Sequence, residues 1–165
     1  MTPAPSIVRR QGRGFTLIEM VVTVAIVGIL AGAALPLGEL SVRRVKEQQL
    51  QHALREVRGA LDDYKRAVDE GRIARGETET GYPKSLALLV DGVSDQKNGS
   101  GKKIYFLRRL PRDPFAVDPE INAARTWGKR SYASPPEDPR EGDDVYDIYS
   151  LAPGAGINGT RYRDW

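Results

Sequence analysis

The chain has 165 residues, which is enough for one soluble domain and an anchor segment. It contains no cysteine, so a disulfide framework, a thiolate metal site and a cysteine nucleophile are excluded. The formal net charge is +3, and Arg9, Arg10 and Arg13 account for all of this excess. Because the remaining residues are balanced in charge, the sequence predicts no nucleic-acid partner.

Residues 1–14 are predicted to form a short basic leader, and residues 15–37 follow it as a long apolar segment. As a helix, with a rise of about 1.5 Å per residue, this segment spans about 30–35 Å, the thickness of a bilayer core. The arginines of the leader favour a cytoplasmic N-terminus. The sequence therefore predicts a single-pass segment that is inserted in a membrane, with the bulk of the chain on the outer side.

Two other export signals are alternatives for this N-terminal region. An ordinary secretory signal peptide would be cleaved near Ala31-Gly32-Ala33, and Arg9-Arg10 is a weak match to a twin-arginine signal. The charge of Glu19 inside the apolar run, and a helical pattern that continues past Ala33, argue against the signal peptide.

Glu19 is the only charged residue between Phe15 and Leu37. A carboxylate within a membrane-length segment costs about 2.5–3.5 kcal/mol, so such a residue indicates a function and a partner of opposite charge. Gly28 and Gly32 form a G-x-x-x-G pattern, which fits either close helix packing or a segment that is simply rich in glycine.

An amphipathic helix is predicted over residues 39–70, because apolar residues recur there at steps of three and four. The stripe consists of Leu50, Leu54, Val57, Leu61, Tyr64 and Val68, widened by Ala53, Ala60 and Ala67. The helix is predicted to end near Gly71, a residue type common at C-caps. Asp62 and Arg66 are predicted to form an i,i+4 ion pair. His52, the only histidine, is predicted to be exposed and not catalytic.

The second half of the chain is predicted to add short elements to this helix. A short helix is predicted over residues 82–90, and residues 91–102 are predicted to form a turn or mobile loop. The predicted strands are Lys103–Arg108, Lys129–Ser134 and Val145–Leu151. The predicted fold class is α+β: a long N-terminal helix, with a membrane half and an amphipathic half, packed against a small antiparallel sheet.

Three side-chain clusters of the second half have structural interpretations. The acidic cluster Asp143, Asp144 and Asp147 is predicted to be a solvated turn beside a strand edge. The basic cluster Arg108, Arg109 and Arg112 is predicted to make contacts within or between subunits. Trp127 and Trp165 are predicted to be core or interface anchors.

The segment Arg13-Gly14-Phe15-Thr16-Leu17-Ile18-Glu19-Met20 resembles the class III signal of type IV pilins and pseudopilins. That signal has glycine before the cleaved bond, phenylalanine after it and glutamate as the fifth mature residue; the match extends to Pro36. The resemblance implies that a prepilin peptidase cleaves the Gly14–Phe15 bond and methylates the amine of Phe15. It also implies that Glu19 of one subunit meets the N-terminus of Phe15 in a neighbouring subunit.

The C-terminal half resembles the major pseudopilins of type II secretion systems. The matching segments are Tyr82-Pro83, residues 105–115, Trp127-Gly128, Arg130-Ser131-Tyr132 and residues 146–150. The resemblance implies a homopolymeric filament subunit that is not an enzyme, with residues 38–165 as a periplasmic head. It implies minor pseudopilins and an inner-membrane assembly platform as partners. A type IV pilin, a minor pseudopilin and a membrane-tethered enzyme or binding module are the alternatives.

Many major pseudopilins bind calcium in the C-terminal loop, but residues 151–160 contain no aspartate here. Asn158 and Asp164 are the candidate ligands. Two such ligands make a weak site for a hard cation that takes six to eight oxygens. The sequence thus predicts no cofactor other than this calcium option.

Overall fold

The computed structural model describes residues 14–98 and 101–165, apart from the side chains of residues 33–37. The chain divides into two compact units, residues Met1–Val42 and Arg43–Trp165. Helix α1, Leu17–Asp69, contributes to both units. The predicted basic leader lies outside the described residues except for Gly14, and so does the side chain of Pro36.

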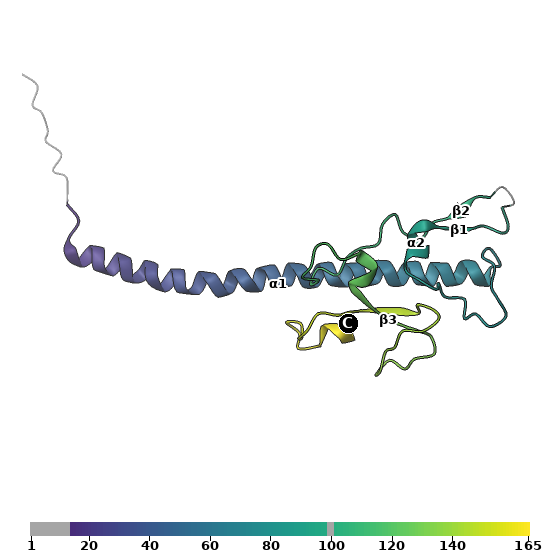
Figure 1. The fold of residues 1–165 in the computed structure, drawn as a ribbon. Coiled ribbons are helices and arrows are strands. Elements are labelled where there is room, and N and C mark those ends of the chain that lie inside the picture. Colours follow the sequence, from purple (N-terminus) through teal and green to yellow (C-terminus); the bar gives the residue numbers. More distant parts are fainter. Residues whose placement is uncertain (1–13, 99–100) are drawn as a thin grey trace, which may run out of the picture. The chain divides into compact units, whose positions relative to one another are not determined.

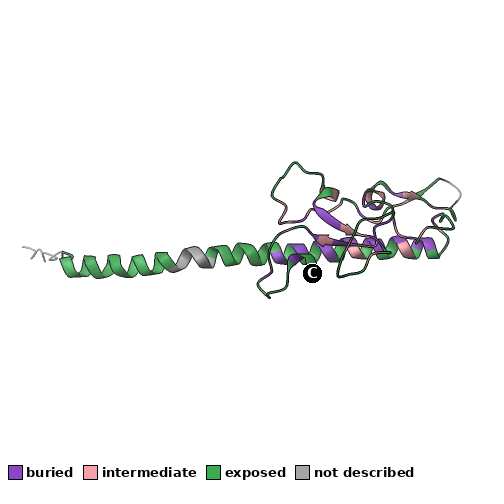
Figure 2. Cartoon of the chain, turned by 60° about the horizontal axis from the view of Figure 1, so that its bottom comes forward, coloured by how far each residue is buried: buried purple, intermediate pink, exposed green. Residues whose placement is uncertain are grey.

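In the first unit, the described residues of α1 are exposed on every side, as the green half of the helix in Figure 2 shows. Large apolar side chains are among them; Leu17 is 83% exposed and Ile29 is 74% exposed. A membrane-spanning segment is predicted over residues 15–37. Among residues 14–98 and 101–165, however, no helix combines enough length with enough hydropathy to cross a membrane.

In the second unit, α1 buries one face and exposes the other, which confirms the predicted amphipathic pattern. The buried face is the purple stripe in Figure 2. All nine predicted stripe residues are buried, with Leu50 and Val57 completely inaccessible. His52 lies on the opposite face and is exposed, as predicted.

Helix α1 ends in a Schellman motif at Gly71, which confirms the predicted C-cap. The Gly71 N–H donates to the carbonyl of Val68, and the Arg72 N–H donates to the carbonyl of Ala67. Gly71 adopts φ +69°, which a glycine reaches without the steric cost of a Cβ atom. The predicted Asp62–Arg66 pair was wrong, because Arg66 reaches back to Asp63 at 2.8 Å.

Helix α2, Ala87–Asp91, is shorter than the predicted helix over residues 82–90. The segment before it is held in turns, because the carbonyl of Pro83 accepts a hydrogen bond from the Val145 N–H. Strand β1, Val93–Ser94, then pairs with strand β2, Lys103–Ile104, as an antiparallel ribbon beside α2 (Figure 1). The prediction of a turn or loop over residues 91–102 missed β1, and β2 is shorter than predicted.

Strand β3, Trp127–Arg130, pairs antiparallel with strand β4, Asp147–Ser150. In this register, Gly128 lies opposite Tyr149. Strand β3 ends earlier than predicted because the Ser131 N–H is bound by the Arg140 carbonyl and not by β4. Strand β4 lies within its predicted range.

The antiparallel strands form two separate ribbons, and the predicted fold class, α+β with a long N-terminal helix packed against a small antiparallel sheet, is confirmed. One core joins the α1 stripe to α2, β3 and β4. Trp127 is 1% exposed within this core and donates its indole N–H to the Pro111 carbonyl, which confirms the predicted anchor. Trp165 is partly buried and packs against the core.

Candidate functional site

The predicted cleavage bond lies just before α1, in backbone that is not helical. Gly14 and Phe15 precede the first helical residue, Leu17, and Phe15 is 79% exposed. Among the residues that the structure describes, none other than the direct chain neighbours has an atom within 4 Å of the position that a Gly14 Cβ would take. The bond between these residues is therefore accessible from outside and is not held by the helix.

Glu19 and Thr16 form a capping box at the start of α1. The Glu19 N–H donates to Thr16 Oγ1 at 3.3 Å, and the Thr16 N–H donates to Glu19 Oε2 at 3.4 Å. This reciprocal pair satisfies two of the free N–H groups at a helix start, and a carboxylate is also favoured there by the helix dipole. The T-x-x-E spacing is visible in the sequence, but the prediction for Glu19 considered only a partner in another subunit.

The helix that follows presents a large apolar surface. The apolar side chains between residues 17 and 30 that are at least half exposed are Leu17, Ile18, Met20, Val21, Val22, Val24, Ile26, Val27, Ile29 and Leu30. Added Cβ atoms at Gly28 and Gly32 would meet nothing within 4 Å, so both positions are open to close approach by another helix. An apolar surface of this extent indicates burial against other chains or lipid.

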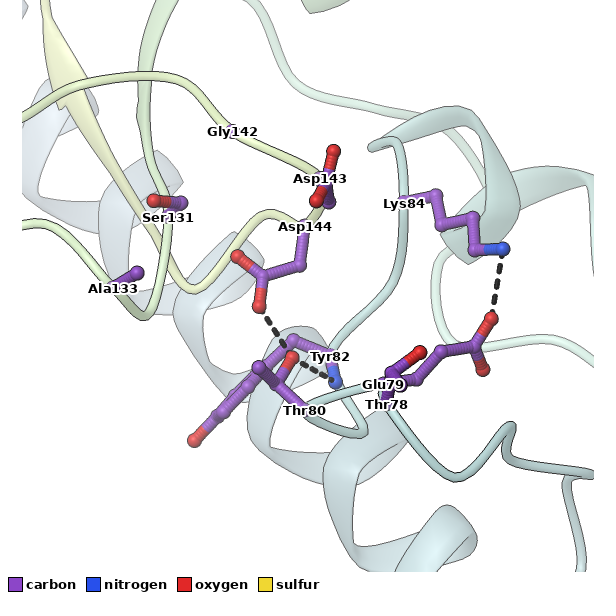
Figure 3. A pocket seen from close by; sticks show the side chains of 10 residues that line it. All are labelled: Thr78, Glu79, Thr80, Tyr82, Lys84, Ser131, Ala133, Gly142, Asp143 and Asp144. Carbon is purple, nitrogen blue, oxygen red and sulfur yellow. Dashed lines mark hydrogen bonds and ion pairs between the residues drawn. The ribbon is translucent and has the colours of Figure 1, made fainter.

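The second unit contains an open cavity of about 490 Å³ between residues 78–84 and 131–144. Figure 3 shows that Asp144 points toward Thr80 and that Lys84 points toward Glu79. Asp144 accepts hydrogen bonds from the Thr80 hydroxyl and from the Tyr132 N–H. Glu79 pairs with Lys84 at 2.7 Å, and the hydrogen bond from Lys84 holds the pKa of that carboxyl below its usual value.

The acidic cluster is thus not simply a solvated turn. Asp144 is 9% exposed and joins the two loops of the cavity. Asp147 accepts from Arg58 at 2.8 Å, so it connects β4 to α1. Of the three aspartates, Asp143 alone is exposed, as expected for a residue of a solvated turn.

In the basic cluster, too, one residue makes contacts within the chain and the others are exposed. Arg112 donates to the carbonyls of Ile121 and Asp118 and so holds the loop before β3, a contact within the subunit as predicted. Arg108 and Arg109 are exposed beside α1. Contacts of this pair with another subunit remain a prediction.

The candidate calcium ligands Asn158 and Asp164 each have a partner from the chain itself. Asn158 Oδ1 accepts from the Thr160 N–H at 3.0 Å, which closes a local turn. The Asp164 carboxylate accepts hydrogen bonds from Nε and Nη2 of Arg161, at 2.7 and 3.2 Å. Their contacts do not bring the two side chains to a common point.

The same loop is held against α1 by a carboxylate that the sequence prediction missed. Glu47 is 9% exposed, and its Oε1 accepts from the Ile157 N–H and the Tyr162 hydroxyl, both at 2.9 Å. Arg43 lies 3.4 Å from the same oxygen. Burial raises the pKa of the Tyr162 hydroxyl. Glu47 precedes Leu50 by three residues, so its place on the apolar stripe was a usable signal.

Two further residues that the sequence prediction missed fix the C-terminal half. Arg58 donates to Asp147, to the Ile148 carbonyl and to the Trp165 carbonyl, which ties the end of the chain to α1. Asp113 is 3% exposed and accepts from the Ser150 hydroxyl at 2.5 Å. Sequence periodicity gives no indication of either role.

Comparison with known proteins shows which family the chain is similar to. Residues 9–35 match the prokaryotic N-terminal methylation motif. The chain is 31% identical over 139 residues to the type II secretion system core protein G of Klebsiella pneumoniae, covering 82% of this chain and 94% of the relative. It is 33% identical over 134 residues to the protein of the same name from Pseudomonas aeruginosa, covering 81% of this chain and 89% of the relative.

A type IV pilus protein is also similar, but over less of its length. The type IV major fimbrial protein FimA of Dichelobacter nodosus is 30% identical over 125 residues, covering 74% of this chain and 75% of the relative. No solved structure matches the chain.

The methylation motif, the long helix α1 and the small α+β unit define a pilin-like protein of the class that carries a prepilin signal. Within that class, the secretion proteins match a larger share of this chain and of their own length than the pilus protein does. The chain belongs to the type II secretion system core protein G family, the major pseudopilins.

Proposed function

We propose that this chain, a structural pseudopilin by its family, is processed at Gly14–Phe15 and then polymerises into a periplasmic filament. A prepilin peptidase would cleave the bond and methylate the new amine of Phe15. Growth of the filament from the inner membrane would drive protein export through the outer membrane. The methylation motif over residues 9–35 supports this proposal.

In this proposal the apolar segment over residues 15–37 is inserted in the inner membrane before assembly. The N-terminus is cytoplasmic and the head, residues 38–165, is periplasmic. The partners are other copies of the chain, minor pseudopilins, the inner-membrane assembly platform and the prepilin peptidase. The work is mechanical and needs no catalytic site in this chain.

The position of Glu19 at the free start of α1 is the observation that carries the assembly mechanism. Its hydrogen bond with the Thr16 N–H is 3.4 Å long, near the upper limit for such a bond, and is therefore weak. The methylated amine of a neighbouring Phe15 offers a full positive charge instead. Among packed apolar helices, either charge left unpaired is strongly penalised, so the pair favours one axial register between subunits.

Substitutions at Glu19 test this pairing and separate it from the capping box. We expect Glu19→Ala and Glu19→Gln each to lower the filament yield at least about tenfold, since an unpaired buried charge costs about 3–5 kcal/mol. Glutamine can still accept from the Thr16 N–H but carries no charge. Sheared filaments from a host that lacks its own copy of this subunit would be quantified.

Thr16→Ala is the matched control, because it removes the hydroxyl half of the capping box and leaves the carboxylate. We expect Thr16→Ala to form filaments. Normal filament yield from Glu19→Gln would show that the charge of this residue is not needed and would reject the pairing mechanism.

A further inference from the structure

Several backbone carbonyls of the C-terminal loop, residues 151–165, accept hydrogen bonds from donors of the same loop. The carbonyl of Gly154 accepts from the Tyr162 N–H at 3.3 Å, and that of Gly156 accepts from the Gly159 N–H at 2.9 Å. The Thr160 carbonyl accepts from the Gly156 N–H at 2.8 Å and from the Trp165 indole at 3.1 Å. These three carbonyl oxygens are therefore already bound to donors of the same loop, and a hard cation would have to compete with those donors.

A cationic side chain from α1 contacts a further carbonyl of the loop. Arg43 donates its Nη2 to the Ala155 carbonyl and its Nε to the Tyr162 hydroxyl. Glu47, one turn further along α1, binds the same hydroxyl and the Ile157 N–H. A positive guanidinium thus contacts a loop carbonyl, and a carboxylate contacts a loop N–H.

Aromatic rings cover this polar contact. Tyr162 packs on Phe115 with ring centroids 4.4 Å apart and on Trp165 with centroids 5.2 Å apart. Gly156 leaves room for the Trp165 ring, because a Cβ atom at this position would lie 2.3 Å from it. In the Arg43–Glu47 pair, the Glu47 side chain is only 12% exposed, and hydrogen bonds to such a shielded carboxylate are stronger than hydrogen bonds in water.

We propose that Arg43 and Glu47 hold the C-terminal loop in the role that calcium has in related proteins, so that this loop folds without a metal ion. Asn158 and Asp164 do not fit a calcium site, since the first closes a turn and the second pairs with Arg161. The proposal concerns the fold of one chain and does not depend on filament assembly.

Trypsin cleavage after Arg161 and Arg163 tests the proposal, because it reports how often the loop opens. The full-length chain, purified in detergent, would be digested in calcium chloride or in the chelator EGTA, and the fragments followed by mass spectrometry. We expect the two rates for the wild-type chain to agree within about twofold. We expect Glu47→Ala to raise both rates about tenfold, since the buried Tyr162 hydroxyl and the Ile157 N–H lose their acceptor.

Glu56→Ala is the matched control, because Glu56 is an exposed carboxylate on the same helix. It should leave both rates unchanged. If Glu47→Ala prevents folding, Arg43→Ala replaces it, since the Arg43 side chain is 44% exposed. The calcium comparison on the wild-type chain needs no variant.

Three results would overturn the proposal. The first is slower cleavage of the wild-type loop in calcium than in EGTA. The second is stoichiometric binding of calcium to the wild-type chain in titration calorimetry. The third is an unchanged cleavage rate in both the Glu47 and the Arg43 variants.

Discussion

At the scale of single residues, the Glu19 carboxylate has a local use in the chain and, in the proposed assembly, an intermolecular one. In the single chain it stabilises the first turn of its own helix through Thr16. A charged partner from another subunit would replace a long hydrogen bond by a charge-assisted one. The exchange favours assembly without leaving the carboxylate unpaired at any stage.

Asp95 provides a residue-scale test of stability through pH. It is 6% exposed, and it accepts hydrogen bonds from Arg72, which follows α1, and from Asn98. The hydrogen bond from Arg72 lowers the pKa of the Asp95 carboxyl from 3.8 to about 2. Because the folded state favours the ionised form, its stabilising contribution is complete above pH 3.8 and is lost as the pH falls towards 2.

We therefore expect Asp95→Asn to weaken the loss of stability between these two pH values, measured by urea denaturation at a series of pH values. Asp91→Asn is the control, since Asp91 is an exposed carboxylate nearby in the sequence. Equal pH profiles for the wild type and Asp95→Asn would contradict the assigned pairing.

At the scale of elements, the β3–β4 ribbon depends on a glycine. An added Cβ at Gly128 would lie 2.3 Å from the ring of Tyr149, its partner across the ribbon. The Arg163 guanidinium stacks on the same ring at 5.5 Å. Gly128 thus lets the tyrosine lie flat over the ribbon, so that the ring connects β4 to the C-terminal segment.

We expect Gly128→Ala to lower the free energy of unfolding by about 1–3 kcal/mol, because the ring must move and the ribbon is overpacked. Gly59→Ala is the matched glycine variant in α1, where an added Cβ meets nothing within 4 Å. Higher helix propensity should stabilise that variant by up to about 1 kcal/mol. Urea denaturation of both variants would measure the effects, and equal stabilities would reject the packing argument.

At the scale of the whole molecule, the excess charge lies at one end of the chain. Arg9, Arg10 and Arg13 account for the formal charge of +3, and the first fourteen residues contain no acid. Removal of residues 1–14 would therefore take the formal charge from +3 to zero. Processing would change a basic precursor into a nearly neutral subunit.

We expect the mature chain to begin at methylated Phe15 and to focus at a lower isoelectric point than the precursor. Intact-mass analysis and isoelectric focusing of the membrane form would measure both changes. Gly14→Val should block cleavage and keep the higher isoelectric point, because the prepilin pattern has glycine at this position. The described surroundings of Gly14 are open, so the variant should still fold. An uncleaved, basic wild-type chain in the membrane would contradict the proposed processing.

The sequence by itself determined what depends on short-range pattern. The steps of three and four along residues 50–68 gave the buried face of α1, and Gly71 gave its end, since helical periodicity and C-caps are local properties. The prepilin motif around Gly14 and Glu19 is also contiguous and led to the family. Local pattern therefore sufficed for the helix, the class of protein and the proposed cleavage site.

Tertiary structure alone decided which distant residues meet. The division into two ribbons follows from pairings such as Ser131 with Arg140, which compete with the β ladder. The contact of Glu47 with Tyr162 joins residues 115 positions apart. Hydrogen bonds and charge pairs depend on distance in space and not on spacing along the chain. The partners of Asn158 and Asp164 in the C-terminal loop likewise follow from the fold and not from their spacing in the sequence.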